Sequence, residues 1–477
     1  MTEAERALKK YFGYPSFRPG QSEIIDSILA KQDTLAIMPT GGGKSICFQI
    51  PGLLLPGITL VISPLISLMA DQVQQLEKRR IPAVFINSSL SKTQIKTRLE
   101  HIRQKKYQFV YAAPERLLTS RWLKLCADIN VSLIAIDEAH CASMWGHDFR
   151  PSYQLIPKFV DQLKTRPTVA AFTATATPQV KQDMLQMLKL KSPQVFWGDT
   201  LRTNLFLKNF ICHSSAQKEA VLFKILKQHQ DQAGIIYCST RKQCQRLAGL
   251  INRLNFNQVL AATPCRFYHG GMDTAARQDI QEQFISNQTK LICATNAFGM
   301  GVDKPDIRFV VHYQLPANLE NFYQEVGRAG RDRQPSDCYL LFYQPDTAIQ
   351  QGLIQNNQDV PDNDKQADQY LQLKLKKLKS LVAYAVCPGC LQQKISKYFG
   401  QEPAAACGEC SQCQPVKFTL TLSEQAWFDQ LQTIPNLTLQ TKYLAAILQP
   451  QTQQQWLKLP GIGTGLKNSF NQLNHYL

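Results

Sequence analysis

Short runs of apolar, β-branched residues recur along the first part of the chain, and each is followed by polar or helix-forming sequence. They are TLAIM from residue 34, ITLVIS from 58, FVYAA from 109, SLIAID from 132 and VAAFTA from 169. Apolar runs that alternate with helical segments are typical of parallel strands buried on both faces by helices. The pattern therefore predicts a parallel α/β domain.

The same alternation of apolar runs with helix-forming segments starts again after a segment with Lys and Pro at 191–193. AGIIYC from 233, RFYH from 266, KLICAT from 290 and RFVVHY from 308 predict a second α/β domain. Residues 346–370 are rich in Gln, Asn and Asp, which predicts a mobile or solvated connection. We expect domains at 1–197 and 198–347, a helical cysteine-containing module at 348–415, and a small tail domain at 416–477.

Composition narrows the class of partner. Lys and Arg number 53 against 36 Asp and Glu, so the 477-residue chain carries a net charge of +17. Such an excess favours nucleic acid, with an acidic membrane surface as the alternative. No apolar run approaches the roughly 20 residues of a membrane span, and the start of the chain lacks a secretory signal. We therefore expect a cytoplasmic, nucleoid-associated protein whose 14 cysteines stay reduced.

A glycine-rich turn follows the first predicted strand, in PTGGGKS from Pro39. Such a turn lets backbone N–H groups approach phosphate oxygens in front of a helix N-terminus. Lys44 can reach the β and γ phosphates, and the Ser45 hydroxyl can bind Mg²⁺. The consensus for such loops begins with Gly, whereas Met38 stands here. The candidate nucleotide-binding residues are Thr40, Gly41, Gly42, Gly43, Lys44 and Ser45.

Two acids end the strand SLIAID, in the quartet Asp137, Glu138, Ala139 and His140. Ligands of open α/β sheets bind at the carboxyl ends of strands. Asp137 would hold Mg²⁺ and Glu138 would deprotonate the attacking water. The alternative is a helix N-cap followed by a favourable first-turn acid. We count Lys44, Asp137, Glu138 and His140 as catalytic candidates.

The segment QEVGRAGRD places Gln324, Arg328 and Arg331 at positions i, i+4 and i+7. On one helix these side chains would share a face and could reach one phosphate. The functional interpretation is an arginine finger that stabilises charge on the γ-phosphate. A solvated basic helix is the alternative, but Gly327 and Gly330 argue against a helix optimised for stability.

The segment CASMWGHDFRP, directly after the acidic quartet, combines rings with polar residues in a pattern unsuited to a core strand. Trp145 and Phe149, separated by His147 and Asp148, predict a loop that presents aromatic faces to unpaired bases, with Arg150 adding charge. Packing of Trp145 into the core is the alternative.

Five cysteines lie within 27 residues: Cys387, Cys390, Cys407, Cys410 and Cys413. Four thiolates suit a closed tetrahedral zinc site, and an iron–sulfur cluster is the competing metal. The spacing alone does not identify the extra cysteine. The remaining nine, such as Cys47 and Cys293, sit beside apolar runs and are expected in the core.

Together these motifs resemble superfamily 2 helicases and, more closely, the RecQ DNA helicases. YFGYPSFRPGQ from Tyr11 resembles the adenine-recognition segment, which implies nucleotide contacts by Tyr14, Arg18 and Gln21. Segments that resemble further helicase motifs begin at Ser63, Ala113, Thr173, Ile236 and Ala294. The resemblance implies that DNA is contacted by Ser63, Trp145, His147, Phe149, Arg150, Ser239, Arg241 and Thr295. The resemblance also implies that the zinc ligands are Cys390, Cys407, Cys410 and Cys413. In the family the first ligand precedes a Tyr-Phe-Gly by eight residues, and Cys390 stands eight residues before Tyr398, so Cys387 is the extra cysteine.

The family resemblance implies two RecA-like lobes with ATP between them, 3′→5′ translocation on single-stranded DNA and duplex unwinding. The expected cofactors are ATP, Mg²⁺ and Zn²⁺. The expected partners are single-stranded and tailed or forked DNA and repair proteins, for a monomer in recombination and repair. The tail, with helices predicted at SEQAWFDQLQTI, LQTKYLAAILQ and QWLKLPGIGTGLKNSFNQLNHYL, shows no β-wing, so we expect a reduced winged helix and no helicase-and-RNase-D C-terminal domain. The alternatives are a translocase or ATP-latched DNA-binding protein without strong unwinding, and an RNA helicase.

Overall fold

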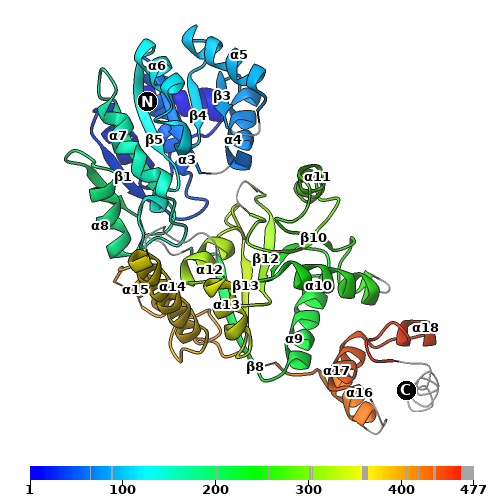
Figure 1. Cartoon of the computed structure of the whole chain (residues 1–477). Helices are drawn as coiled ribbons and strands as arrows, with labels where there is room; N and C mark the ends of the chain where they lie inside the picture. The colour runs from blue at the N-terminus through cyan, green and yellow to red at the C-terminus, as the bar shows by residue number, and fades with distance from the viewer. Residues whose placement is uncertain are drawn as a thin grey trace. The chain divides into compact units, whose positions relative to one another are not determined.

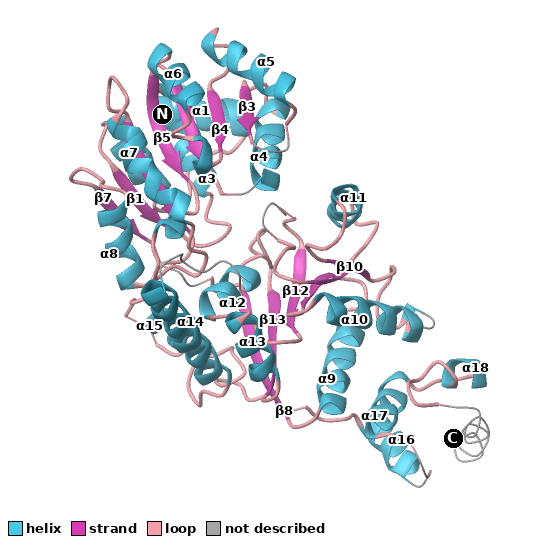
Figure 2. Ribbon diagram, viewed as in Figure 1, coloured by secondary structure: helices cyan, strands magenta, loops and turns pink. Residues whose placement is uncertain are grey.

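The computed structural model contains two compact units (Figures 1 and 2). The first comprises Met1–Arg202 with Ser396–Glu402, and the second comprises Thr203–Ile395 with Pro403–Leu477. The described residues are 1–64, 66–87, 90–198, 202–255, 258–299, 302, 304–356, 364–402, 405–416, 418–432, 434 and 437–462.

A seven-stranded sheet forms the centre of the first unit, in the order β3-β4-β2-β5-β6-β1-β7. Every neighbouring pair is parallel, and the register places Ile37 of β1 opposite Thr173 of β6. Parallel pairing follows from the helices that return the chain between strands. The strands are β1 (Thr34–Ile37), β2 (Ile58–Ile62), β3 (Ala83–Ile86), β4 (Phe109–Ala112), β5 (Val131–Ile136), β6 (Thr168–Thr173) and β7 (Gln194–Trp197).

Helices cover both faces of this sheet, because successive strand residues point to opposite sides. Leu35 and Ile37 of β1 join a core with α5–α8, whereas Ala36 and Met38 join a second core with α1–α4. The helices are α1 (Glu3–Ala7), α2 (Gln21–Leu29), α3 (Lys44–Leu54), α4 (Ile66–Lys78), α5 (Lys92–Arg103), α6 (Ser120–Asp128), α7 (Leu155–Asp161) and α8 (Pro178–Met187), with short helical turns η1 (Leu8–Phe12), η2 (Pro114–Arg116), η3 (Ala139–Ala142) and η4 (Pro151–Gln154).

The second unit contains a six-stranded parallel sheet in the order β10-β11-β9-β12-β13-β8. The two parallel α/β domains predicted from the apolar runs are confirmed. The strands are β8 (Leu205–Cys212), β9 (Ala233–Tyr237), β10 (Arg266–Tyr268), β11 (Leu291–Ala294), β12 (Ile307–His312) and β13 (Ser336–Tyr343). The helices are α9 (Ser215–Gln228), α10 (Arg241–Leu254), α11 (Thr274–Ile285), α12 (Leu319–Val326) and α13 (Asp346–Gln355).

The expected solvated connection is wrong for its first part. Residues 346–355 form α13, which buries Asp346 in an ion pair with Lys218 and buries Gln350 against Ser239. The polar composition predicted a solvated segment, but these polar side chains are buried because they pair with polar groups elsewhere in the unit. Residues 357–363 lie outside the described part of the chain.

The basic segment forms the long helix α14 (Asp364–Ala385), as predicted, and α15 (Leu391–Tyr398) follows it. A buried ion pair of 2.5 Å joins Lys377 of α14 to Glu320 of α12, and the rings of Tyr384 and Phe322 lie 5.4 Å apart. The zinc-module helix is therefore packed on the helix that precedes the two candidate arginines.

The tail begins with the two predicted helices, α16 (Leu422–Gln432) and α17 (Leu439–Leu448), followed by the short α18 (Gln453–Trp456). Their apolar side chains share one core with α9 and α10. Lys224 of α9 pairs with Glu424 at 3.2 Å, and Lys227 donates to the Ile447 carbonyl at 2.9 Å. No strand occurs among the described residues after 404, and most of GIGTG and the rest of the third predicted helix lie outside them. The winged-helix-like domain stays a prediction.

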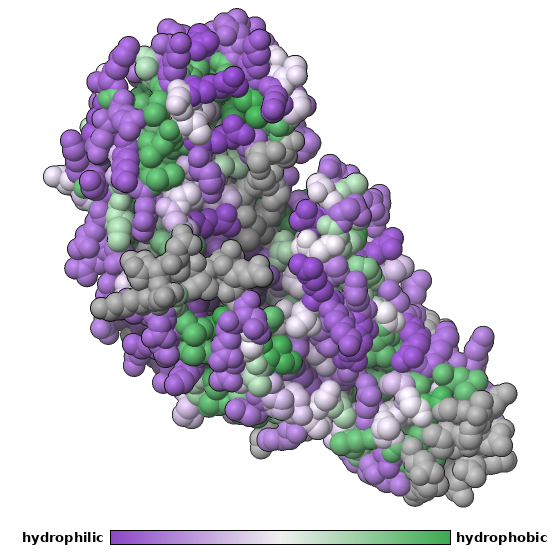
Figure 3. All heavy atoms as spheres, in the orientation of Figure 1, coloured by the Kyte–Doolittle hydropathy of each residue, from purple (hydrophilic) through white to green (hydrophobic). Residues whose placement is uncertain are grey.

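Among the described helices, none combines the length with the apolar composition that a membrane span requires. Hydrophilic residues cover most of the face drawn in Figure 3. All nine cysteines outside the 387–413 group are buried, as predicted, including Cys47 and Cys293.

Candidate functional site

The glycine-rich turn connects β1 to α3, whose first residue is Lys44. Gly41 and Gly43 have φ values of 79° and 81°, which residues with a Cβ rarely adopt. The Lys44 ammonium lies 3.5 Å from the Met38 carbonyl, and Ser45 occupies the first turn of α3. Backbone N–H groups at a helix N-terminus form an anion site, and here a cationic side chain lies beside them. Thr40, Gly42 and Ser45 are partly exposed in this loop.

Two residues of the predicted adenine segment hold this loop. The Arg18 guanidinium donates to the Gly41 carbonyl, and the Gln21 amide donates to the Gly42 and Gly43 carbonyls at 3.3 and 3.1 Å. Gln21 also accepts from the Arg18 backbone at 2.8 Å and is buried. Tyr14 is 46% exposed. The segment therefore contacts the phosphate loop itself, and its role toward adenine stays a prediction.

The acidic pair follows β5 directly. Asp137 is buried, its backbone N–H donates to the Ile62 carbonyl at 2.9 Å, and its carboxylate accepts the Glu138 N–H at 3.0 Å. Burial, together with the Glu138 charge, raises the pKa of Asp137 to about 7, although Lys44 and a hydrogen bond from Gln72 oppose the rise. Glu138 has a φ of 47°, an uncommon conformation for a non-glycine residue. A carboxylate held in this way is suited to a cation or a proton.

His140 connects the acidic pair to the next strand. Its buried ring lies 2.9 Å from the Thr173 hydroxyl and 3.3 Å from the Glu138 carboxylate, both measured from Nδ1. Thr173 ends β6, so side chains from two neighbouring strand ends meet here. The His140 ring also stacks on His147, with centroids 4.1 Å apart. A continuous set of contacts therefore runs from the acidic pair into the aromatic segment.

The aromatic segment is a loop, as predicted, between η3 and η4. Trp145 is 45% exposed, which contradicts the alternative of a core tryptophan. Phe149 and His147 are partly exposed, and Arg150 donates to Asp148 at 3.3 Å and to the Pro64 carbonyl at 2.9 Å. A Cβ on Gly146 would lie 2.3 Å from the His140 carbonyl, so the loop folds tightly against η3.

The other DNA-binding candidates differ in exposure. Ser63 is only 1% exposed, and its Oγ has no hydrogen-bond partner among the described residues. Ser239 donates to the Leu315 carbonyl at 2.9 Å, while Arg241 is exposed at the start of α10. Thr295 is buried just after β11. Arg241 is therefore the most accessible of the four, and all four roles stay predictions.

The predicted single helix for Gln324, Arg328 and Arg331 is wrong. α12 ends at Val326, so only Gln324 lies on it, because Gly327 and Gly330 end the helix and Gly330 adopts a φ of 54°. The two arginines nevertheless converge on one loop. Arg328 donates to the Gly299 carbonyl, and Arg331 donates to the Val302 carbonyl at 3.1 Å. Carbonyl groups of the loop after β11, rather than a helix face, therefore hold the two guanidinium groups.

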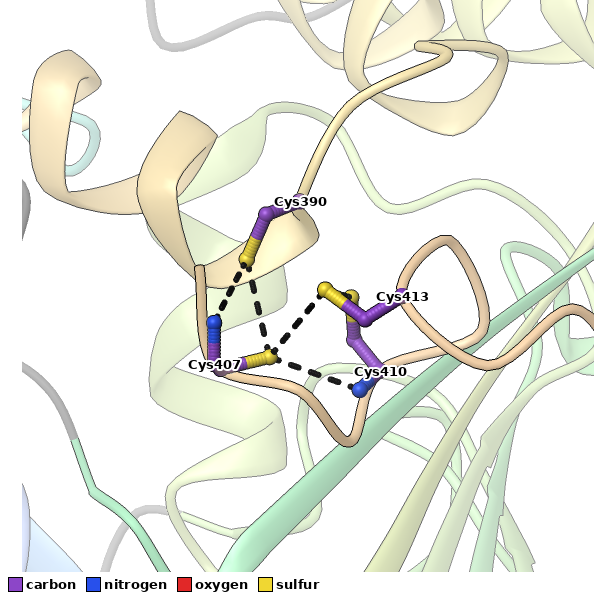
Figure 4. Close-up of side chains that lie close together, drawn as sticks. All are labelled: Cys390, Cys407, Cys410 and Cys413. Atoms are coloured by element: carbon purple, nitrogen blue, oxygen red, sulfur yellow. Dashed lines mark hydrogen bonds between the residues drawn. The ribbon is translucent and has the colours of Figure 1, made fainter. Parts of the chain in front are cut away.

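Four thiols form a compact cluster in the second unit (Figure 4). Their sulfur atoms all lie within 4.8 Å of one another, with Cys390 3.5 Å from Cys407 and Cys410 3.6 Å from Cys413. The members are Cys390, Cys407, Cys410 and Cys413.

Backbone N–H groups point at this cluster. The N–H of Cys407 donates to Cys390 Sγ at 3.4 Å, and the N–H of Leu391 donates to Cys410 Sγ at 3.3 Å. Burial opposes ionisation of Cys390, but the N–H groups of Cys407 and Gln393 and the neighbouring thiols lower its pKa to about 7. Cys387 lies outside the four, with its thiol 3.5 Å from the Gly389 carbonyl. Four thiols with N–H donors fit a structural zinc ion, which would close this loop by tetrahedral coordination.

Sequence reasoning missed the residues that support these groups. Gln72 hydrogen-bonds the Asp137 carboxylate, and the Tyr153 hydroxyl donates to the Asp137 carbonyl at 2.8 Å. Gln72 follows Ser63, where one of the motif-like segments begins, but nothing in its spacing marks it as a partner of Asp137. Tyr153 carries no local signal at all.

A phosphate loop and an acidic pair on one parallel sheet, with a second such sheet, define the class of nucleotide-dependent helicases. The DEAD/DEAH box helicase family profile matches residues 18–184, and the helicase conserved C-terminal domain profile matches 217–333. The RecQ zinc-binding profile matches residues 344–414.

Similarity to curated proteins identifies the helicase family to which the chain belongs. An ATP-dependent DNA helicase RecQ of Bacillus subtilis (strain 168) is 42% identical over 424 residues, covering 89% of this chain and 69% of the relative. A probable ATP-dependent DNA helicase RecS of the same organism is 44% identical over 358 residues, or 74% and 70% of the two chains. The chain belongs to the RecQ family. Among solved structures, Mycobacterium smegmatis helicase Lhr bound to ssDNA and AMP-PNP shares the fold, with a TM-score of 0.57 at 16% identity over 80% of this chain and 57% of that one.

Proposed function

We propose that this chain is an ATP-dependent DNA helicase that moves 3′→5′ on single-stranded DNA and separates duplex DNA. The observation that carries the proposal is the contact chain from the acidic pair through His140 and His147 to a loop with an exposed Trp145, in a chain of the RecQ family. Such a chain can transmit the state of the nucleotide site to a base-stacking surface.

ATP is the proposed substrate of the glycine-rich loop. Thr40, Gly41, Gly42 and Gly43 surround the phosphates, Lys44 neutralises their charge, and Tyr14, Arg18 and Gln21 hold the adenine end. Ser45 and Asp137 would hold Mg²⁺, which supplies charge neutralisation on the phosphates when bound. The buried Asp137 carboxylate fits a cation, because burial makes its ionised form costly without one.

Glu138 is the proposed general base for the attacking water, and His140 orients it from 3.3 Å. Gln324, Arg328 and Arg331 are proposed to stabilise charge on the γ-phosphate. Zinc is proposed on Cys390, Cys407, Cys410 and Cys413 as a structural ion.

DNA is proposed to bind by stacking on Trp145 and Phe149, with His147 and Arg150 beside them. Ser63, Ser239, Arg241 and Thr295 are the proposed backbone contacts; Ser63 and Thr295 would need to become accessible. We place the activity in recombination and repair by a monomer, with repair proteins as partners, in a nucleoid-associated cytoplasmic setting.

DNA-stimulated ATP hydrolysis tests this proposal. Lys44→Ala should abolish turnover with and without single-stranded DNA. Trp145→Ala should keep the DNA-independent rate and lose stimulation, whereas Met187→Ala, which removes a similarly exposed apolar side chain of the same unit, should behave as wild type. Retained DNA-stimulated turnover in Lys44→Ala would contradict the phosphate-site assignment.

A further inference from the structure

Arg328 is held more tightly than an arginine on a helix surface would be. It is only 7% exposed, it lies beyond the end of α12, and its Nη1 donates to the Gly299 carbonyl. A Cβ on Gly299, whose φ is 140°, would lie 2.2 Å from Arg328 Cζ. The guanidinium therefore rests directly on the Gly299 peptide, so whatever fixes that peptide also fixes Arg328.

Tyr237 holds the peptide that precedes the Gly299 peptide in the same loop. It ends β9, and its buried hydroxyl donates to the Phe298 carbonyl at 3.0 Å, one residue before Gly299. The same hydroxyl forms a hydrogen bond with Arg328. Burial raises the pKa of Tyr237, so the hydroxyl keeps its proton and remains a donor.

His312 and Glu325 in turn fix Tyr237. The His312 ring stacks on the Tyr237 ring with centroids 5.4 Å apart, and its Nε2 lies 2.7 Å from the Glu325 carboxylate. Glu325 stands in the last turn of α12, and its carbonyl accepts the Arg328 N–H at 3.2 Å. His312 is completely buried and Glu325 nearly so. Both side chains therefore contact other side chains inside the fold rather than solvent.

We propose that Tyr237, His312 and Glu325 are positioning residues that aim the Arg328 guanidinium for ATP hydrolysis. The proposal rests on the proposed function, because it presumes that Arg328 acts on the γ-phosphate. The end of β9, the loop after β11 and the end of α12 contact this arginine, and the end of β12 reaches it through Tyr237 and Glu325. A guanidinium displaced by about 1 Å from its working position loses much of its effect on the transition state.

Conservative variants separate positioning from folding. Tyr237→Phe keeps the ring and its stacking but removes the hydroxyl. Glu325→Gln keeps an oxygen that accepts from His312, whereas Glu325→Ala removes it. The matched control is Tyr339→Phe, which removes a buried hydroxyl that hydrogen-bonds His229 and Asp337 in the same sheet, away from Arg328.

The readouts are kcat and KM for DNA-stimulated ATP hydrolysis, and the affinities for ADP and for ADP with aluminium fluoride. Tyr237→Phe and Glu325→Ala should lose about 10- to 100-fold in kcat and in affinity for the aluminium fluoride complex, as expected of a misplaced transition-state contact. KM for ATP and affinity for ADP should stay within about twofold of wild type. Glu325→Gln and Tyr339→Phe should match wild type.

The proposed positioning role would be contradicted if Tyr237→Phe hydrolysed ATP at the wild-type rate. It would also be contradicted if the control Tyr339→Phe lost as much activity as Tyr237→Phe. Equal losses in ADP and aluminium fluoride affinity would also overturn it, because they would indicate a general structural defect. A wild-type chain that hydrolyses no ATP with DNA present would instead contradict the proposed function.

Discussion

Gln21 lies so close to Gly43 that its amide nitrogen would be 2.4 Å from a Cβ built on that glycine. The same amide donates to the Gly43 carbonyl at 3.1 Å. Gln21, 22 positions earlier in the chain, therefore leaves no room for a side chain at Gly43, the last glycine before Lys44. The phosphate loop and the segment around Arg18 and Gln21 form one structural unit.

Gly43→Ala should lower ATP affinity at least about tenfold, because the new methyl group displaces Gln21 and the φ of 81° becomes strained. Gly20→Ala is the matched control, since Gly20 has the same φ but open space around its Cβ position. It should cost stability and leave ATP affinity largely intact. Binding of a fluorescent ATP analogue, with thermal unfolding in parallel, checks both. Equal losses of affinity in the two variants would show that strain alone is responsible.

The buried Asp137 should make stability depend on pH. Its pKa is raised to about 7 in the fold from 3.8, so the folded chain binds the proton more tightly than the unfolded chain between these values. The stabilising contribution of the protonated form is complete below about pH 4 and is lost as the pH rises through about 7. Above that pH the fold carries a buried charge.

Asp137→Asn measures this contribution directly. With EDTA present and no nucleotide, the unfolding midpoint of the variant should rise relative to that of wild type between pH 5 and about pH 7, because unfolding of the wild type releases the Asp137 proton over this range. At pH 8 the variant should be the more stable of the two. A difference in midpoint that stays constant from pH 5 to pH 8 would contradict the raised pKa.

Cys390 and Cys387 should differ in their effect on zinc. Cys390→Ala removes a member of the four-thiol cluster, so zinc content should fall close to zero and the 364–413 region should become sensitive to protease. Cys387→Ala removes a buried thiol outside the cluster, at a cost of about 1 kcal/mol, and should keep its zinc. Metal analysis of the purified variants decides; equal zinc loss from both would refute the ligand assignment.

Asp33 should be important for the stability of the first unit. Its buried carboxylate accepts from Arg166 at 2.5 and 3.0 Å, from the Val169 N–H at 3.0 Å and from the Lys191 N–H at 2.7 Å, which joins the starts of β1, β6 and β7. Asp33→Ala leaves these donors without a partner and should cost about 3 kcal/mol.

Asp128→Ala provides the control for Asp33. Asp128 pairs with Arg103 at 3.4 Å on the exposed surface, so its loss should cost less than about 1 kcal/mol. Urea unfolding of both variants compares the two costs. Similar destabilisation would show that the buried contacts of Asp33 contribute little.

Alternation of apolar and helical segments was enough to predict the central strands, such as β1, β5 and β9. The strands it missed are β3, β7 and β8, which lie at sheet edges, and β13, which lies inside the second sheet. β7 is partly exposed, and β8 alternates between buried and partly exposed residues, so neither shows the continuous apolar run of a central strand. Edge position depends on the whole sheet, which no local pattern contains.

The candidate site could be predicted where one short segment carries the chemistry, as in the glycine-rich loop, the acidic pair and the cysteines. It could not be predicted where distant segments meet. The spacing of Arg328 and Arg331 indicated a helix, but glycine conformation and the carbonyls of Gly299 and Val302 decide their position. Tyr237 and His312 end two neighbouring strands, and only the pairing of β9 with β12 brings them together.

Strand separation of a 3′-tailed DNA duplex with ATP, beside the matching 5′-tailed duplex, tests helicase function most directly. We expect the wild-type chain to separate the 3′-tailed duplex only, and Lys44→Ala to separate neither. Failure to separate the 3′-tailed duplex by protein that still hydrolyses ATP on single-stranded DNA would contradict the unwinding function and would leave a translocase or an ATP-latched DNA-binding protein.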